Sequence, residues 1–168
     1  RDDVESRGLG DVYKRQDIYN DAILHTTATF DTEIKDYEDR LAWFQAHTGQ
    51  YVIFVYEEAG TVAGYASLSR YRERKAFDPA VEISIYIHAG YRGRGIGRSL
   101  MEKTLQYAKE CPQIGTVVSL ITSENEVSIR LHERFGFSYC GQIRQAGVKF
   151  GRKLGLNAYQ IIYDREIE

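Results

Sequence analysis

A glycine-rich turn with three arginines lies in the middle of this 168-residue chain. It follows an alternating stretch, Val81 to His88, and leads into an apolar-periodic stretch that begins near Ile96. The residues of the turn are Arg92, Gly93, Arg94, Gly95, Ile96, Gly97 and Arg98. Glycines leave backbone N–H groups uncovered, and a following helix directs its unpaired amides and positive end at the turn. The pattern predicts a site for an anion such as a pyrophosphate; a plain strand-to-helix connection is the alternative.

The spacing of the glycines distinguishes this turn from two common nucleotide-binding loops. A dinucleotide fingerprint requires G-x-G-x-x-G, whereas residues 92–97 have the register R-x-x-G-x-G. A nucleotide-kinase loop ends in Gly-Lys-Ser/Thr, and residues 97–99 (GRS) lack the lysine. Neither loop type fits the sequence.

Glu82 is a candidate proton acceptor on the strand that precedes the turn. Alternation over residues 81–88 places an apolar set of side chains on one face and a polar set on the other. The apolar set is Val81, Ile83, Ile85 and Ile87, and the polar set is Glu82, Ser84, Tyr86 and His88. A carboxylate can take the proton that an ammonium group must lose before it attacks an acyl carbon. On the pattern alone, a surface glutamate is the favoured interpretation.

His132 is a second candidate for proton transfer. The unperturbed pKa of histidine is about 6.5, so its side chain exchanges protons at neutral pH. Asn125 lies two helical turns earlier, and both side chains therefore project from one face of the predicted helix. A helix histidine that is satisfied by a backbone carbonyl is an equally good interpretation.

Arg72 and Arg74 are candidates for binding an anionic substrate group. They alternate at the end of a predicted strand, which would put them on one side if the chain stays extended. Guanidinium groups offer planar, multidentate donors to a carboxylate or phosphinate. The ordinary alternative is a solvated strand end.

The remaining periodicities predict a mixed α/β sheet. Helices are expected at residues 17–25, 36–50 and 96–110, and from a capping box at 123–126 to about Phe135. Strands are expected at residues 51–56, 62–72, 81–88, 116–121, 139–143 and 158–163. A glycine-rich, basic segment separates the last two strands.

Composition and charge narrow the class of protein. The length suits one domain, and 43% hydrophobic residues with mixed charges are typical of a soluble globular protein. A net charge of −2 argues against a general nucleic-acid binder. Because there is no apolar run long enough for a bilayer and no hydrophobic signal segment, we expect a cytoplasmic protein without a membrane partner. Neither Cys111 and Cys140 nor the four histidines have metal-site spacing, so no metal is expected.

The first sixteen residues differ from the rest of the chain. Arg1 to Gln16 shows little periodicity, and residues 11–16 (DVYKRQ) are similar to the translated end of a transposon adapter used in sequencing. We hypothesise that this segment is not native, and we assign the functional domain to residues 17–168. Recovery of the same codons when the gene is re-amplified from its source would refute the hypothesis.

Several separated motifs resemble the GNAT superfamily of N-acetyltransferases. The register of the glycine turn is followed by Asn125, Ser128, Leu131 and residues 132–137 (HERFGF), in the order typical of that family. More narrowly, phosphinothricin and methionine sulfoximine N-acetyltransferases look similar at Glu82 and residues 18–23 (IYNDAI), 27–30 (TATF) and 147–152 (GVKFGR). The resemblance runs from Asp17 to the C-terminus. It implies an α/β (α+β) GNAT fold with a central mixed, mostly antiparallel twisted sheet, about four flanking helices, and a first strand that is missing or replaced by the N-terminal segment.

The resemblance also implies roles for individual residues. Acetyl-CoA would be held by the turn from Arg92 to Arg98, by Asn125, and by the backbone of Ile85, Tyr86 and Ile87. Glu82 would be the general base, and His132 would act as base for the amine or as acid for the departing thiolate. The acceptor pocket would contain Thr27, Phe30, Arg72, Arg74 and Lys149.

These roles describe an acetyl-CoA-dependent N-acetyltransferase for the α-amine of phosphinothricin, methionine sulfoximine or methionine sulfone. Direct transfer is expected, because Cys111 and Cys140 have no apparent base partner. One alternative is a non-catalytic acyl-CoA-binding sensor, and another is an acetyltransferase for a different amine or a protein N-terminus. The resemblance also implies a homodimer. Close relatives tend to carry Trp and Asp at the positions of Lys153 and Gly155, which leaves the exact substrate open.

Overall fold

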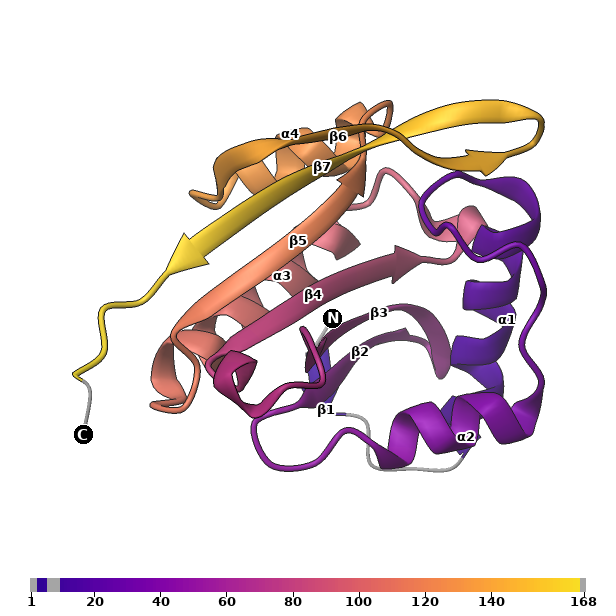
Figure 1. Ribbon diagram of the computed structural model, residues 1–168. Coiled ribbons are helices and arrows are strands. Elements are labelled where there is room, and N and C mark those ends of the chain that lie inside the picture. Colours follow the sequence, from indigo (N-terminus) through magenta and orange to yellow (C-terminus); the bar gives the residue numbers. More distant parts are fainter. Residues whose placement is uncertain (1–2, 6–9, 167–168) are drawn as a thin grey trace.

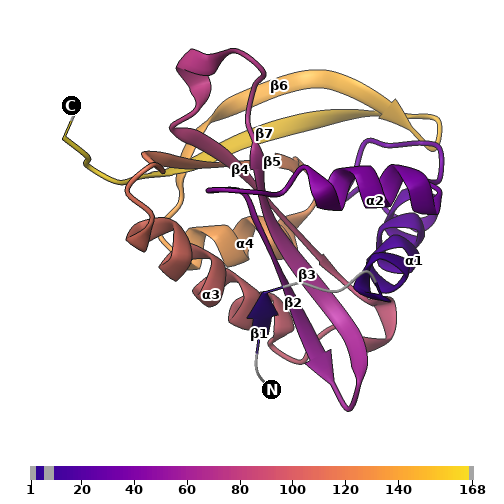
Figure 2. The same ribbon diagram turned by 90° about the horizontal axis from the view of Figure 1, so that it is seen from below.

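The computed structural model describes residues 3–5 and 10–166. These residues form one seven-stranded sheet with α1 and α2 on one face and α3 and α4 on the other (Figures 1 and 2). The helices are α1 (Gly10–His25), α2 (Tyr37–Gln45), α3 (Ile96–Glu110) and α4 (Glu126–Arg134). The strands are β1 (Asp3–Glu5), β2 (Val52–Glu58), β3 (Thr61–Arg70), β4 (Ala80–Ile87), β5 (Thr116–Thr122), β6 (Ser138–Lys149) and β7 (Arg152–Ile162). Their order across the sheet is β1-β2-β3-β4-β5-β7-β6.

The sheet contains a single parallel pairing, between β4 and β5. Residues 80–82 of β4 pair with residues 116–118 of β5, and the other neighbouring strands that the structure describes pair antiparallel. Beyond this short ladder the two strands diverge and open the middle of the sheet (Figure 1). The mixed, mostly antiparallel sheet is therefore confirmed.

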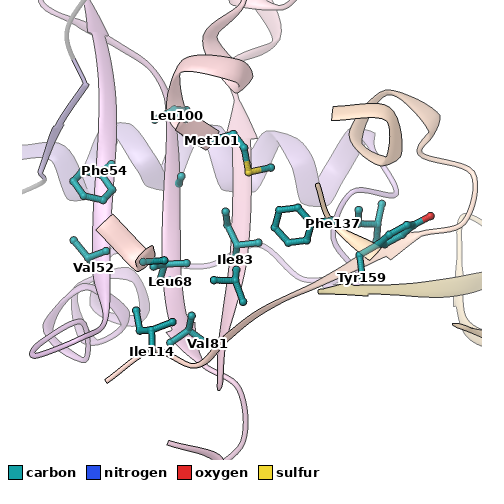
Figure 3. Close-up of a cluster of buried hydrophobic side chains, with 14 of the residues drawn as sticks. Val52, Phe54, Leu68, Val81, Ile83, Leu100, Met101, Ile114, Phe137 and Tyr159 are labelled. Atoms are coloured by element: carbon teal, nitrogen blue, oxygen red, sulfur yellow. The ribbon is translucent and has the colours of Figure 1, made fainter. Parts of the chain in front are cut away.

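The main apolar core lies between the sheet and α3 (Figure 3). Leu100 and Met101 of α3 are fully buried there, against Val81 and Ile83 of β4. The predicted alternation of β4 is confirmed, because its apolar side chains enter this core. Its polar side chains, including Glu82, therefore face α1 and α2.

Several element boundaries differ from the sequence-based expectations. Helix α2 ends at Gln45, not at residue 50. Helix α4 is capped by Asn125, whose side-chain oxygen accepts from the Ser128 N–H, so the capping box that began at residue 123 was wrong. Strands β6 and β7 continue through residues 144–157 and meet in one long hairpin (Figure 1). Register shifts in β6 absorb the glycine-rich stretch, which explains why its strand pattern is irregular.

The N-terminal segment takes part in the fold. Strand β1 pairs with residues 54–56 of β2, so the first strand is present in a short form. Helix α1 begins at Gly10 rather than near residue 17, and the side chains of Val12 and Arg15 are buried. Arg15 stands at an inward position of the helix, three residues before the buried Ile18, and this charged residue hides the helical periodicity in the sequence. That residues 1–16 are not native stays a prediction.

The part of the chain that the structure describes contains no helix long and apolar enough to span a membrane. In those same residues no group of three or more His, Cys, Asp or Glu side chains is placed to hold a metal ion. Cys111 and Cys140 are both free thiols, the first half-buried and the second exposed.

Replacing Leu100 with alanine should reduce the free energy of unfolding by about 2–5 kcal/mol, because the change leaves a cavity in the core. Leu100 is 0% exposed, whereas Leu24 on α1 is 52% exposed and provides a matched control. Urea unfolding of the two variants should show a large loss for Leu100→Ala and a small one for Leu24→Ala. Equal losses would contradict the position of α3.

Candidate active site

The opening between β4 and β5 leaves one edge of β4 without a neighbouring strand. Strand β4 continues from residue 83 to Ile87 after its last pair with β5, which is Glu82 with Val118. On its other edge, β4 stays paired with β3 as far as Ile87. Backbone N–H and C=O groups that face such an opening can bind an extended ligand as a further strand would.

The glycine turn lies at the end of this edge and leads directly into α3. Gly95 is the N-cap of α3 with φ 77°, and Gly93 has φ 78°, a region that favours glycine. A Cβ atom at either position would meet no other atom within 4 Å, so the turn has an open side. The first amides of α3 have no carbonyl partners within the helix. The turn can therefore receive an anion, as its sequence predicts.

The turn contributes backbone more than side chains. Ile96 is buried in the core, so only its backbone is available to a ligand. Arg94 forms an ion pair with Glu58 at 3.1 Å, and Arg98 approaches Glu102 at 3.7 Å. These arginines are exposed and add positive potential around the turn, while the amides define the geometry of the site.

Glu82 lies where β4 and β5 begin to diverge. Its side chain is on the α1 and α2 face, opposite the buried Val81 and Ile83. Burial raises the pKa of Glu82, and the nearby positive charge of Arg72 partly opposes that increase. A carboxylate with a raised pKa at this position is suited to accept a proton.

A polar cavity of about 290 Å³ lies beside Glu82 on the same face of the sheet. Ser69 and Ser84 line it, and both are close neighbours of Glu82. Ser69 pairs with Glu82 across β3 and β4, and Ser84 is two residues beyond Glu82 on the same face of β4. Helix α2 contributes Arg40 and Trp43 to its wall. These cavity residues were not predicted from the sequence, although Arg40 and Trp43 are three residues apart and therefore share one face of α2.

His47 is also close to the cavity. Its Nδ1 lies 2.6 Å from the Trp43 carbonyl oxygen, so Nδ1 carries the proton and donates it there. Its Nε2 then accepts from the Ser69 hydroxyl, 2.8 Å away. Burial lowers the pKa of His47. The side chain fixes Ser69 beside Glu82.

The structure brings together three of the predicted acceptor-pocket residues, Thr27, Phe30 and Lys149. The Phe30 ring packs against Gly147 so closely that a Cβ atom there would come within 2.9 Å of it. Lys149 is only 4% exposed, and its Nζ donates to the Thr29 carbonyl oxygen at 2.8 Å. The tip of the β6–β7 hairpin therefore holds the loop between α1 and α2.

A second set of contacts holds the same loop, and no local sequence pattern predicts it. The Thr27 hydroxyl donates to Glu124 at 2.7 Å, and Arg152 donates to both oxygens of Glu124 at 2.8 and 3.0 Å. These hydrogen bonds lower the pKa of Glu124 to about 2. The loop, the hairpin and the turn before α4 thus meet at one carboxylate.

The two predicted anion-binding arginines do not share a strand. Strand β3 ends at Arg70, so Arg72 and Arg74 lie in the connection to β4 and the expected extended geometry was wrong. Arg72 stacks on Tyr71 at 4.1 Å and is near enough for its charge to act on Glu82. Arg74 precedes a short 3-10 helix, Lys75–Phe77.

His132 is 3% exposed and has hydrogen-bond partners at both ring nitrogens. Nδ1 lies 2.7 Å from the Ser128 carbonyl oxygen and donates to it, so Nε2 accepts from the Ser119 hydroxyl at 2.8 Å. The ring also packs edge-on against Phe137 at 4.8 Å. Burial lowers the pKa of His132, and the Ser128 carbonyl opposes this shift. This geometry is that of the alternative interpretation, a helix histidine satisfied by a backbone carbonyl, and the catalytic role stays a prediction.

Comparisons with known proteins agree with this architecture. The sequence profile of the acetyltransferase (GNAT) family matches residues 15–137. The L-amino acid N-acyltransferase MnaT of Escherichia coli K12 is 39% identical, over 90% of this chain and 88% of its own. The L-methionine sulfoximine/L-methionine sulfone acetyltransferase of Salmonella typhimurium LT2 is 41% identical, over 88% of this chain and 86% of its own.

A solved structure shows the same fold. The Salmonella typhimurium protein yncA, determined with its cofactor acetyl-CoA, has a TM-score of 0.92 and 36% identity, and the match covers 100% of this chain and 98% of that one. The chain therefore belongs to the acetyltransferase (GNAT) family and is an acyltransferase.

Stability should fall as the pH is lowered below about 6.5, the pKa of histidine in the unfolded chain. His47 and His132 have lowered pKa values when folded, so the unfolded chain binds more protons in the window below 6.5. Above this window the contribution of both residues is fully present. Urea unfolding at pH 7.5 and 5.5 should show a smaller loss for His132→Gln than for the unchanged protein. The same loss in both would contradict the burial of a neutral His132.

Proposed function

We propose that this protein is an acetyl-CoA-dependent N-acetyltransferase that modifies the α-amine of a small amino-acid-like substrate. The main observation in support of this function is the position of Glu82. It lies where β4 and β5 diverge, next to an unpaired strand edge and the glycine turn. Phosphinothricin, methionine sulfoximine and methionine sulfone are the proposed acceptors. The names of the relatives, which refer to L-amino acids and to methionine derivatives, support this substrate class.

The residues present fit acetyl-CoA, which supplies an activated acetyl thioester. Amides from Gly93 to Arg98 would bind its pyrophosphate, because the open side of the turn and the start of α3 both favour an anion. The free edge of β4, from Ile85 to Ile87, would pair with the pantetheine arm. An N–H group there that faces the thioester oxygen would stabilise the charge developing on it, an effect of about 3 kcal/mol. Asn125 is assigned to the cofactor side by resemblance, although its side chain caps α4.

The acceptor side of the proposed mechanism uses Glu82 and its neighbours. Glu82 takes a proton from the substrate ammonium, directly or through water. The amine is then neutral and can attack the carbonyl carbon of a thioester. Arg72 and Arg74 bind the substrate carboxylate, with Thr27, Phe30 and Lys149 enclosing the pocket. Transfer is direct, which is consistent with the surroundings of Cys111 and Cys140, whose thiols donate to amide and carbonyl oxygens. For His132, base and acid roles both remain predictions.

We also propose that the protein is a cytoplasmic homodimer. The β6–β7 hairpin presents large apolar side chains to the surface, namely Tyr139, Ile143, Val148, Phe150 and Ile162. Apolar side chains that gather on one exposed element are typical of a protein interface. Nucleic acid and membrane partners are not part of the proposal.

The proposed function is tested by mixing the purified protein with acetyl-CoA and a panel of amines while free thiol release is followed. The panel contains the three proposed amino acids, a polyamine, an aminoglycoside and a peptide with a free N-terminus. Thiol release with the amino acids is expected. Binding of acetyl-CoA without thiol release from any amine would favour the sensor, and release with another amine alone would change the acceptor.

Glu82→Gln should lower kcat by about 10²–10⁴-fold, because the amide cannot accept the proton of the amine. Since the pKa of Glu82 is raised, activity of the unchanged protein should decline as the pH falls through that pKa, and the variant should lose this dependence. The exposed Glu110 provides the matched control, Glu110→Gln. A Glu82→Gln variant with unchanged rate and pH profile would remove Glu82 from catalysis.

Arg72→Ala and Arg74→Ala should each raise the Michaelis constant for an anionic amino acid by on the order of tenfold, because a charged hydrogen bond is lost. Steady-state kinetics at saturating acetyl-CoA measures this effect. Arg130→Ala is a control, since Arg130 is on the surface of α4 and approaches Glu126 at 3.9 Å. Unchanged constants in both site variants would refute the carboxylate assignment.

A further inference from the structure

The polar cavity beside Glu82 has no role in the function proposed so far. Its volume is about 290 Å³, and it lies between the β3–β4 face of the sheet and the helices α1 and α2. We propose that this cavity receives the side chain of the acceptor amino acid and selects a neutral side chain that carries oxygen atoms, such as a sulfone or sulfoximine. This inference rests on the proposed N-acetyltransferase function and names the group that determines its acceptor specificity.

The cavity begins where the reacting amine must be. Ser69 pairs with Glu82, and Ser67 pairs with Ser84, so the serines follow Glu82 along one face. Ser84 is two residues beyond Glu82, which is about 7 Å along the strand. An amino acid whose amine is at Glu82 can therefore place a side chain of methionine length against Ser67 and Ser84.

Arg40 supplies the main donor in the cavity. It is 8% exposed, and its guanidinium is held between the rings of Tyr19 and Trp43, at 4.6 and 5.0 Å. Its Nε and Nη2 donate to Asp39 at 3.2 and 3.0 Å. A guanidinium has five N–H donors, so this pair does not use its full capacity. Its fixed position makes it a ready partner for oxygen atoms of a bound side chain.

The charges that line the cavity cancel. Asp31 and Asp39 carry two negative charges, and Lys35 and Arg40 carry two positive charges. Asp31 also accepts a hydrogen bond from Tyr19. An anionic phosphinate would bring a net negative charge into a cavity whose own charges already balance, whereas a sulfone offers acceptor oxygens without a net charge. A thioether would leave the cavity donors without partners, which a polar site rejects strongly.

The test measures kcat/KM for L-methionine sulfone and for L-methionine at saturating acetyl-CoA. Arg40→Met keeps the length and apolar stem of the side chain while it removes all donors. In this variant the preference for the sulfone over methionine should fall by about tenfold or more. Ser67→Ala should shift the preference in the same direction by a smaller factor.

Arg70→Met is the matched control. Arg70 also stacks on a tyrosine, Tyr51 at 5.1 Å, and pairs with an aspartate, Asp78 at 2.8 Å, but it is outside the cavity lining. Its substitution should leave the preference unchanged. In the unchanged protein, phosphinothricin should have a lower kcat/KM than methionine sulfone.

The outcomes separate the inference from the proposed function. If the unchanged protein acetylates no amino acid, the proposed function fails. A second outcome is that the unchanged protein acetylates amino acids, while an Arg40→Met variant with a folded circular dichroism spectrum loses kcat/KM equally for the sulfone and for methionine. Arg40 would then be structural, and the inference would be overturned. If Arg40→Met does not fold, the serine variants Ser67→Ala and Ser84→Ala test the inference instead. An unchanged preference for the sulfone over methionine in both variants overturns it. A higher value for phosphinothricin than for the sulfone also overturns it.

Discussion

The short parallel ladder between β4 and β5 is the constraint on which the rest of the structure depends. It joins the two halves of the sheet at residues 80–82 and 116–118 and ends at Glu82. If the ladder continued, the edge of β4 would be occupied by β5. If it were absent, the half that contains β5, β6 and β7 would lose its connection to β4. Its length therefore determines both the integrity of the sheet and the width of the opening.

Around this opening, one face of β4 packs into the apolar core and the other carries polar side chains. Side chains from α3 form the core on one face, while α2 places Arg40 over the serines of β3 and β4 on the other. The tip of the hairpin holds the loop between α1 and α2 in two ways. Lys149 donates to the loop directly, and Arg152 binds Glu124, which also contacts the loop. The polar face consequently has walls from three parts of the chain that are far apart in sequence.

Much of the fold could be predicted because its signals are local. The turn glycine Gly95 and the apolar stripe after it locate α3, and strict alternation locates β4 and the face of Glu82. The N-cap at Asn125 was missed because Ser123 and Asn125 both suit that position, and only the tertiary structure distinguishes them. Arg40 and the Glu124–Arg152 contact were missed because they depend on pairs separated by long stretches of chain. The burial of His132 depends likewise on Ser119, a residue of a different element.

The division of labour between backbone and side chains has an evolutionary consequence. On the donor side, the proposed contacts come from amides of the glycine turn and the edge of β4, and these persist when most side chains change. On the acceptor side, the proposed contacts come from side chains of α2, β3 and the hairpin, and each substitution there would alter the pocket. Such a protein can therefore diversify its acceptors by ordinary point mutation while it retains one donor. Mutations in the surrounding helices and loops would then change which acceptor is bound, while the backbone groups at the opening would continue to bind the same donor.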